Sequence, residues 1–149
     1  MAEIRFYHLQ SQTIEQALPK LAELVLKSGN KGIIKVADKN IAKQIDKALW
    51  AYSPESFLPH DVEGSKYPKE QELFITSREE NPAEAKMALF VNCEKLEDLS
   101  LFDRVLYMFE GKLDKIITTA REDYKNYKTQ GHEMSYWQQS DQGRWEQKA

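Results

Sequence analysis

The amino-acid sequence predicts an α/β fold in three layers, α/β/α, with a mainly parallel central sheet. Short runs rich in branched and aromatic residues alternate with longer segments whose apolar residues recur at helical spacing. A chain of 149 residues is also long enough to bury its own core without disulfides or metal. We expect one domain over residues 1–138 and a flexible tail over 139–149, where Ser, Asp, Gly and charged residues predominate.

The first half of the chain alternates strand and helix. Residues 4–9 and 31–38 predict strands, and residues 40–50 predict an amphipathic helix. Between the two strands, Thr13 and Gln16 have the spacing of a capping box and open a helix that ends near Ser28. Pro19 falls inside this segment. Because an interior proline costs a backbone hydrogen bond, we expect the helix to begin effectively at Pro19.

The second half begins less regularly, with two prolines and then a polar loop over residues 61–71. Strands are predicted again after this loop, and the turn at Gly111 precedes the last helix, at residues 113–128. The three predicted strands are residues 73–77, 87–92 and 104–110.

The motifs of nucleotide-binding and catalytic sites are absent from the sequence. The loop after the first strand, residues 10–13, contains no glycine, and neither GxGxxG nor GxxxxGK[ST] occurs. The histidines His8, His60 and His132 lack zinc-site spacing, no GxSxG is present, and Cys93 is typical of a small buried hydrophobe. We expect a Rossmann-like topology without a nucleotide-binding loop, no cofactor or metal, and no catalysis. A small α/β enzyme with a diffuse site stays as an alternative, because distant residues can converge.

Charge and hydropathy limit the other classes of function. With 21 basic and 24 acidic side chains the net charge is -3, so general affinity for nucleic acid is not expected, although a local basic patch remains possible. The first residues lack the basic and apolar regions that are typical of a signal peptide, so we expect none, and no stretch approaches the roughly 18 apolar residues of a membrane span. We expect a cytoplasmic protein.

Four residues of the last predicted helix carry the most distinctive chemistry. Arg121, Tyr124, Lys125 and Lys128 fall on one helical face, so three cations and one ring could meet an acidic, partly apolar partner. Spacing alone favours a solvated face whose cations complement the helix dipole.

Several segments together resemble the chi subunit of bacterial DNA polymerase III holoenzyme over nearly the whole chain. The most specific are Ala-Leu-Trp ending at Trp50, followed by Ser-Phe-Leu-Pro-His ending at His60, and Ala-Arg-Glu-Asp-Tyr-Lys-Asn-Tyr-Lys at residues 120–128. Phe6-Tyr7, Val36-Ala37-Asp38, Gly131 and Trp137 occur in the same order and spacing.

The resemblance implies a non-catalytic accessory subunit of the clamp-loader complex, with two protein partners. Such proteins pair one-to-one with the psi subunit and bind the acidic C-terminal tip of single-stranded DNA-binding protein, which ends in aspartates, an apolar residue, proline and phenylalanine. Contact with DNA is then indirect. We expect Arg121, Lys125 and Lys128 to pair with the tip and Tyr124, with Trp50, to form a socket for its ring.

For psi, the resemblance points to Phe57 and Leu58 after the second helix, as apolar anchors. Phe57 could equally plug the sheet edge, and a tryptophan such as Trp50 at the end of an amphipathic helix is commonly core. Direct binding of single-stranded DNA by the cations and Tyr rings of the last helix is a further alternative.

Overall fold

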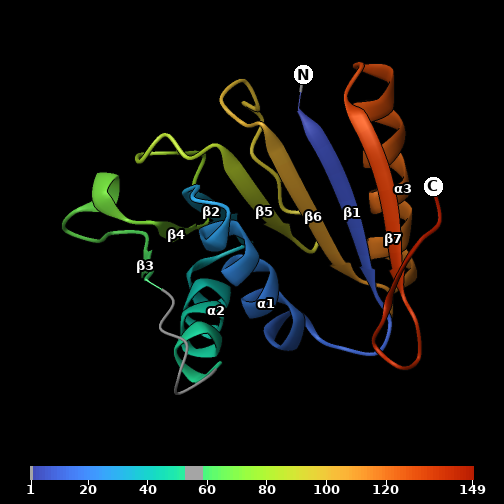
Figure 1. Ribbon diagram of the computed structural model, residues 1–149, viewed down its shortest axis with the longest axis horizontal. Helices are drawn as coiled ribbons and strands as arrows, with labels where there is room; N and C mark the ends of the chain where they lie inside the picture. The colour runs from blue at the N-terminus through green and yellow to red at the C-terminus, as the bar shows by residue number, and fades with distance from the viewer. Residues whose placement is uncertain (1, 53–58) are drawn as a thin grey trace.

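A computed structural model describes residues 2–52 and 59–149 and shows one mixed sheet flanked by helices (Figure 1). Within these residues the sheet has eight strands in the order β3-β4-β2-β5-β6-β1-β7-β8, all paired in parallel except for the antiparallel pair β7 and β8. The strands are β1 Glu3–Leu9, β2 Gly32–Lys35, β3 Asp61–Val62, β4 Leu73–Thr76, β5 Met87–Val91, β6 Arg104–Glu110, β7 Glu133–Gln139 and β8 Trp145–Gln147.

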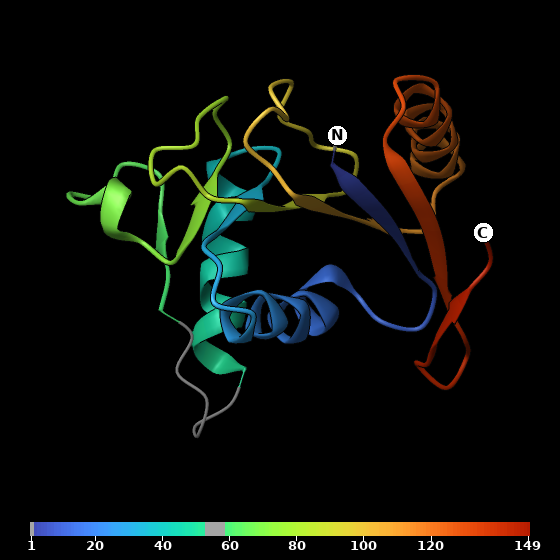
Figure 2. The ribbon, with the colours of Figure 1, turned by 45° about the horizontal axis from the view of Figure 1, so that its top comes forward.

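Three α-helices in the described residues cover the two faces of this sheet (Figure 2). Helices α1, Ile14–Lys27, and α2, Lys39–Ala51, pack with a cluster of aliphatic residues on one face. Helix α3, Asp114–Thr129, packs with an aromatic-rich cluster on the other. The predicted three-layer α/β fold with a mainly parallel sheet is confirmed. In the part of the chain that the structure describes, none of the helices has the length and apolar character that crossing a membrane requires.

The start of α1 follows the predicted capping box. The Gln16 N–H donates to Thr13 Oγ1 at 3.3 Å and the Thr13 N–H donates to Gln16 Oε1 at 3.0 Å. The helix therefore begins at Ile14, and the expectation that it begins at Pro19 is wrong. Pro19 is buried inside the helix, and the reciprocal cap together with the packing of the apolar face offsets the missing backbone hydrogen bond.

Two side chains from distant strands also hold the entry to α1. Glu110, at the end of β6, accepts the Ile14 N–H on Oε1 at 2.8 Å. Gln139, at the end of β7, accepts the Ser11 and Gln12 N–H groups on its Oε1 at 3.2 and 3.1 Å. The Gln139 side chain is buried, and these hydrogen bonds supply the partners that a buried amide oxygen needs.

Strands β7 and β8 were not predicted from the sequence. Strand β7 pairs with β1 in parallel, which aligns Phe6 with Tyr136 and Tyr7 with Trp137, and β8 then pairs with the end of β7. Flexibility of residues 139–149 stays a prediction, but the structure includes residues 145–147 in the sheet. The polar segment 61–71 contains β3 and a short 3₁₀ turn, Pro68–Glu70.

Candidate functional site

The four residues singled out in the sequence lie along one flank of α3. Arg121, Lys125 and Lys128 are exposed, whereas Tyr124 is half-buried at the boundary with the sheet. Within the described residues none of the three cations belongs to an ion pair. We call this set the α3 stripe. An anionic partner could therefore approach these cations without breaking a salt bridge to any described residue.

Tyr124 anchors the stripe to an aromatic cluster on the sheet. Its ring centroid lies 5.2 Å from that of Phe6 on β1 and 6.0 Å from that of Tyr136 on β7, both in edge-to-face geometry. Phe6 in turn stacks on Tyr107 at 4.1 Å. Edge-to-face packing of this kind fixes ring orientations, so the stripe has a rigid aromatic border toward β7.

Arg121 acts electrostatically on two groups at this border. Burial lowers the pKa of His8, and the nearby Arg121 charge lowers it further. Burial raises the pKa of Tyr136, and Arg121 partly opposes that rise. His8 Nδ1 and the Tyr136 hydroxyl are 2.8 Å apart and share a hydrogen bond. With a neutral imidazole below it, Arg121 remains the main local cation.

The rotation of α3 is set by a buried carboxylate on its inner face. Asp123 accepts a hydrogen bond from the Tyr107 hydroxyl and pairs with Lys95 Nζ at 2.6 Å. Burial, followed by the Asp123 contact, raises the pKa of Tyr107, so its hydroxyl stays protonated and donates. Because Asp123 is fixed inward, Arg121, Lys125 and Lys128 must project from the opposite flank.

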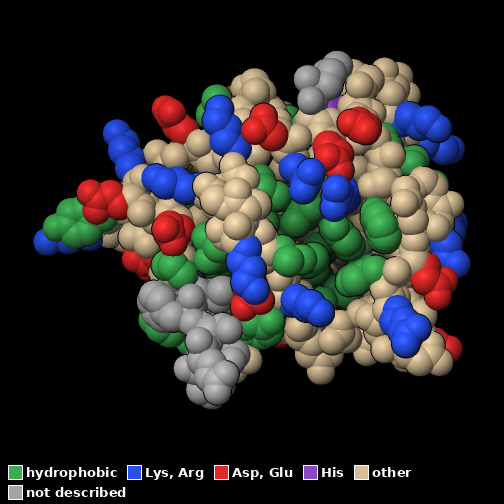
Figure 3. Space-filling view, in the orientation of Figure 1, with side chains coloured by type: hydrophobic (Ala, Val, Ile, Leu, Met, Phe, Trp, Pro, Cys, Tyr) green, Lys and Arg blue, Asp and Glu red, His purple; other side chains and the backbone are tan. Residues whose placement is uncertain are grey.

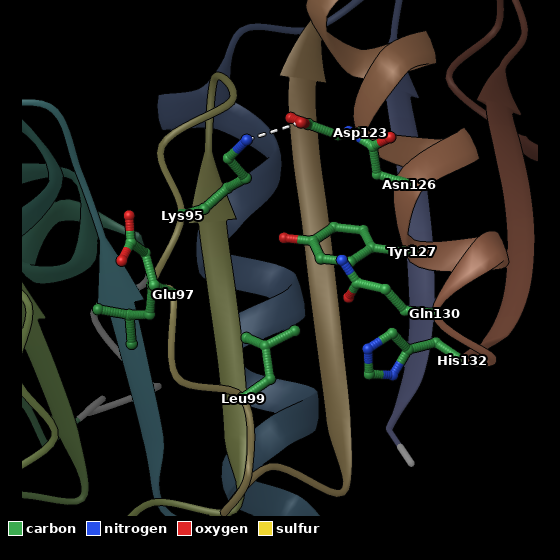
Figure 4. Close-up of a pocket in the computed structure, with 9 residues that line it drawn as sticks. Lys95, Glu97, Leu99, Asp123, Asn126, Tyr127, Gln130 and His132 are labelled. Atoms are coloured by element: carbon green, nitrogen blue, oxygen red, sulfur yellow. Dashed lines mark hydrogen bonds and ion pairs between the residues drawn. The ribbon is translucent and has the colours of Figure 1, made fainter.

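A cavity of about 320 Å³ lies on the other flank of α3, next to the loop after β5 (Figure 4). The side chains of Asn126, Tyr127, Gln130 and His132 face it from the helix side, and Lys95 reaches across to Asp123. Its one lysine is neutralised by this pairing, and none of the stripe cations lines it. The cavity is therefore separate from the stripe and has little attraction for an acidic ligand.

The geometry offers no assembled metal or thiol chemistry among the described residues. No three side chains of His, Cys, Asp or Glu lie together in a way that could hold a metal ion. Cys93 is partly buried, its Sγ lies 3.5 Å from the Ile116 carbonyl oxygen, and burial raises its thiol pKa. A raised pKa disfavours the reactive thiolate.

Comparison with known proteins assigns the family. The sequence model of the family described as DNA polymerase III chi subunit, HolC, matches residues 1–135. The chain belongs to this family.

Curated chi proteins are similar to this chi-family chain over most of their lengths. The DNA polymerase III subunit chi of Haemophilus influenzae is 29% identical over 83% of this chain and 85% of its own length. The subunit chi of Escherichia coli is 25% identical over 91% and 97%. The probable subunit chi of Rickettsia prowazekii is 25% identical over 84% and 74%. As a chi-family member, the chain is an accessory and not a catalytic subunit of DNA polymerase III, and takes part in DNA replication.

The structure of this chi-family chain does not bring Trp50 together with the stripe. Trp50 lies on α2, and α2 and α3 pack on opposite faces of the sheet (Figure 2). One socket cannot contain both Trp50 and Tyr124, and that part of the expectation is corrected. Instead, Trp50 is 59% exposed, and its ring lies 5.0 Å from the ring of His60, whose Nε2 is 2.8 Å from Asp46 Oδ1. Phe57 and Leu58 fall outside the described residues.

Sequence reasoning missed the partners that shape the stripe. Tyr136 and His8 border it, but each becomes a neighbour only when β7 pairs with β1. The short alternation of polar Glu133 and Ser135 with apolar Met134 and Tyr136 is the signal that could have indicated a strand there. Asp123 was seen only as a charge that offsets the stripe, whereas its burial fixes the helix.

Proposed function

We propose that this chi-family protein links the polymerase complex, in the cytoplasm, to single-stranded DNA-binding protein through the α3 stripe. Its occupant would be the acidic C-terminal tip of that protein, with a terminal carboxylate on phenylalanine. A second surface, around the end of α2, would bind the psi subunit and connect the chain to the clamp loader. Contact with DNA would then be indirect.

One observation carries the proposal for the stripe: three exposed cations, which form no ion pair with any residue that the structure describes, flank an aromatic border. Arg121 offers a planar fork that suits a carboxylate, and Lys125 and Lys128 continue the positive charge along the helix. Tyr124 and Tyr136 lie 6.0 Å apart, ring to ring, and supply apolar surface beside those cations. A short peptide that combines aspartates with a terminal aromatic ring matches both features.

The experiment for the stripe is a fluorescence titration with an acidic peptide ending in Ile-Pro-Phe, with either a free carboxylate or a C-terminal amide. We expect the free acid to bind and the amide to bind at least about tenfold more weakly. Arg121→Ala and Lys125→Ala should each weaken binding in a salt-dependent manner. Lys115→Ala is the matched control, since Lys115 is exposed on the same helix but outside the stripe. Equal binding of acid and amide would contradict the proposal.

A competing single-stranded oligonucleotide separates the proposal from direct DNA binding. The same cations and rings could stack and neutralise a strand, so an oligonucleotide is titrated alone and then against the bound peptide. Little binding of DNA without a partner is expected from a chain of net charge -3. Tight binding of DNA that displaces the peptide would favour the alternative.

For psi, the exposed ring of Trp50 and the predicted anchors Phe57 and Leu58 support a surface at the end of α2. A large exposed aromatic ring is a frequent hot spot of protein interfaces. We therefore assign Trp50 to the psi surface and remove it from the tip socket. Co-purification of Trp50→Ala and Phe57→Ala with psi tests this, with Tyr67→Ala as the control because Tyr67 is 56% exposed elsewhere. Undiminished co-purification of both variants would overturn the assignment.

A further inference from the structure

An apolar groove runs along α1, on the face of the sheet opposite α3. Two cavities, of about 240 and 190 Å³, lie along this helix, and Leu21 and Leu24 line both of them. Figure 3 shows the surface between α1 and β7 as a hollow of hydrophobic side chains with Lys and Arg around it. The groove is separate from the α3 stripe and from Trp50.

The floor and walls of the groove come from residues distant in sequence. Tyr7 on β1 and Leu106 on β6 form the floor, and Trp145 on β8 lines the wall opposite α1. The rings of Tyr7 and Trp145 lie 5.0 Å apart in edge-to-face geometry. At the rim, the Leu24 side chain is 53% exposed. Exposed apolar patches with polar residues at their rim mark interaction sites, and Leu24 lines both cavities of this groove.

In the described ranges 2–52 and 59–149, no helix covers this part of the sheet. On one face, α3 covers β1 and β7. On the opposite face, α1 and α2 lie toward the other end of the sheet (Figure 2). Parallel sheets are normally covered by helices on both faces. The groove therefore has the position that a further helix beside α1 would occupy.

Backbone hydrogen bonding favours a helix over an extended peptide as occupant. Strands β1 and β6, which form the floor, are paired on both edges. An extended segment lying on this apolar floor would find no backbone partners there, and unpaired N–H and C=O groups are costly. A helix satisfies its own backbone and needs only an apolar face.

Charge at the two ends of the groove specifies the occupant further. At one end Arg5 and Arg104 line the larger cavity and share the carboxylate of Glu3, at 2.6 and 3.1 Å. Among the described residues this is the one acidic side chain with which these two cations form ion pairs. At the other end Lys20 is exposed, lines the smaller cavity and forms no ion pair with any described residue. We propose that the groove binds an amphipathic helix of a partner protein, with apolar residues on Leu21, Leu24 and Tyr7 and acidic residues near Arg104 and Lys20.

Photo-crosslinking in cells that produce the full chain tests this proposal. A benzophenone amino acid replaces Leu24, and the same group at Glu15, exposed on the far side of α1, is the matched control. We expect a crosslink only from position 24, to a segment with apolar residues at helical spacing and acidic residues flanking them. No product above the Glu15 level, a crosslink to a second copy of this chain, or a crosslinked segment without that pattern would overturn the proposal.

A synthetic peptide of the crosslinked segment then gives the affinity. Leu24→Arg and Arg104→Glu should each weaken its binding at least about tenfold, and a peptide with its facing acidic residue changed to lysine should regain affinity for Arg104→Glu. Unchanged affinity for Leu24→Arg would overturn the proposal. Both variants should bind the acidic tip peptide as the unmodified chain does, which shows that they are folded and separates this result from that for the α3 stripe.

Discussion

The Tyr107 hydroxyl on β6 donates a hydrogen bond to the Asp123 carboxylate on α3, and both side chains are buried. This bond joins the sheet to the helix at the middle of the aromatic cluster, and Lys95 approaches the other carboxylate oxygen from the loop after β5. The position of the stripe on the surface therefore depends on a polar contact beneath it.

Tyr107→Phe should lower the free energy of unfolding by about 1–3 kcal/mol, because the buried carboxylate loses a donor. Urea denaturation measures the change. Tyr67→Phe, which removes a hydroxyl from an exposed ring, should change stability by less than about 0.5 kcal/mol. Equal stabilities of the two variants would show that the Asp123 contact contributes nothing.

Stability should fall as the pH drops below about 6.5, the ordinary pKa of histidine. The folded chain holds the pKa of His8 below that value, so the unfolded chain binds a proton that the folded chain resists. The stabilisation is complete above the unfolded pKa and is lost as the pH falls through the folded one. Denaturation at pH 7.5 and pH 5.5 should show a smaller pH effect for His8→Gln than for the unmodified chain; identical pH effects would contradict this assignment.

Arg121→Ala should raise the pKa of His8, since it removes the nearby cation while burial still holds the value below normal. An NMR titration of the His8 ring protons measures this directly. Lys115→Ala removes the same charge at a position outside the stripe and should leave the pKa of His8 unchanged. A His8 titration that does not move in Arg121→Ala would place the guanidinium away from the imidazole.

Gly111→Ala should destabilise the fold by about 1–3 kcal/mol, because a Cβ there would overlap His8 Nε2. The turn at Gly111 approaches β1 closely, and its N–H donates to the Leu9 carbonyl at 2.9 Å. A double-mutant cycle with His8→Ala is the control: with the ring removed, the alanine should cost much less. A cost independent of His8 would mean that the backbone, and not the ring, requires glycine.

Gln139→Leu should cost about 2 kcal/mol or more, because the Ser11 and Gln12 N–H groups lose their acceptor. Thermal or urea unfolding measures the loss. Gln138→Leu, at the neighbouring and less buried position of the same strand, should have a much smaller effect. Similar losses in both variants would argue against a specific role for the Gln139 amide.

The parts of the fold that depend on local sequence were predictable. Thr13 and Gln16 are three residues apart and cap α1 as their spacing indicates, and the fully buried strands read as apolar runs. Strand β7 was missed because most of its residues are only partly buried and polar Ser135 and Gln138 lie on opposite faces, so its apolar residues follow no strict alternation. Helical spacing also put Arg121, Lys125 and Lys128 on one face, and all three are exposed.

The pairing of Trp50 with Tyr124 failed for a topological reason. Right-handed crossovers put a helix on one face or the other according to the direction in which the next strand is added. Helix α2, which carries Trp50, follows β2, and from β2 to β3 the chain moves one way along the sheet, whereas from β6 to β7, across α3, it moves the other way. Helices α2 and α3 therefore lie on opposite faces. Strand order is a long-range property that the spacing of Trp50 or Tyr124 does not encode.

The side chains that hold the entry to α1 have a consequence for ligands. In many α/β proteins the N–H groups at the start of the first helix, above the carboxyl end of the first strand, hold a phosphate. Here the Glu110 carboxylate accepts from Ile14, and the Gln139 amide oxygen accepts from Ser11 and Gln12. The chain thus supplies its own anion where a nucleotide would place one, and a phosphate could enter only by displacing Glu110 against its charge.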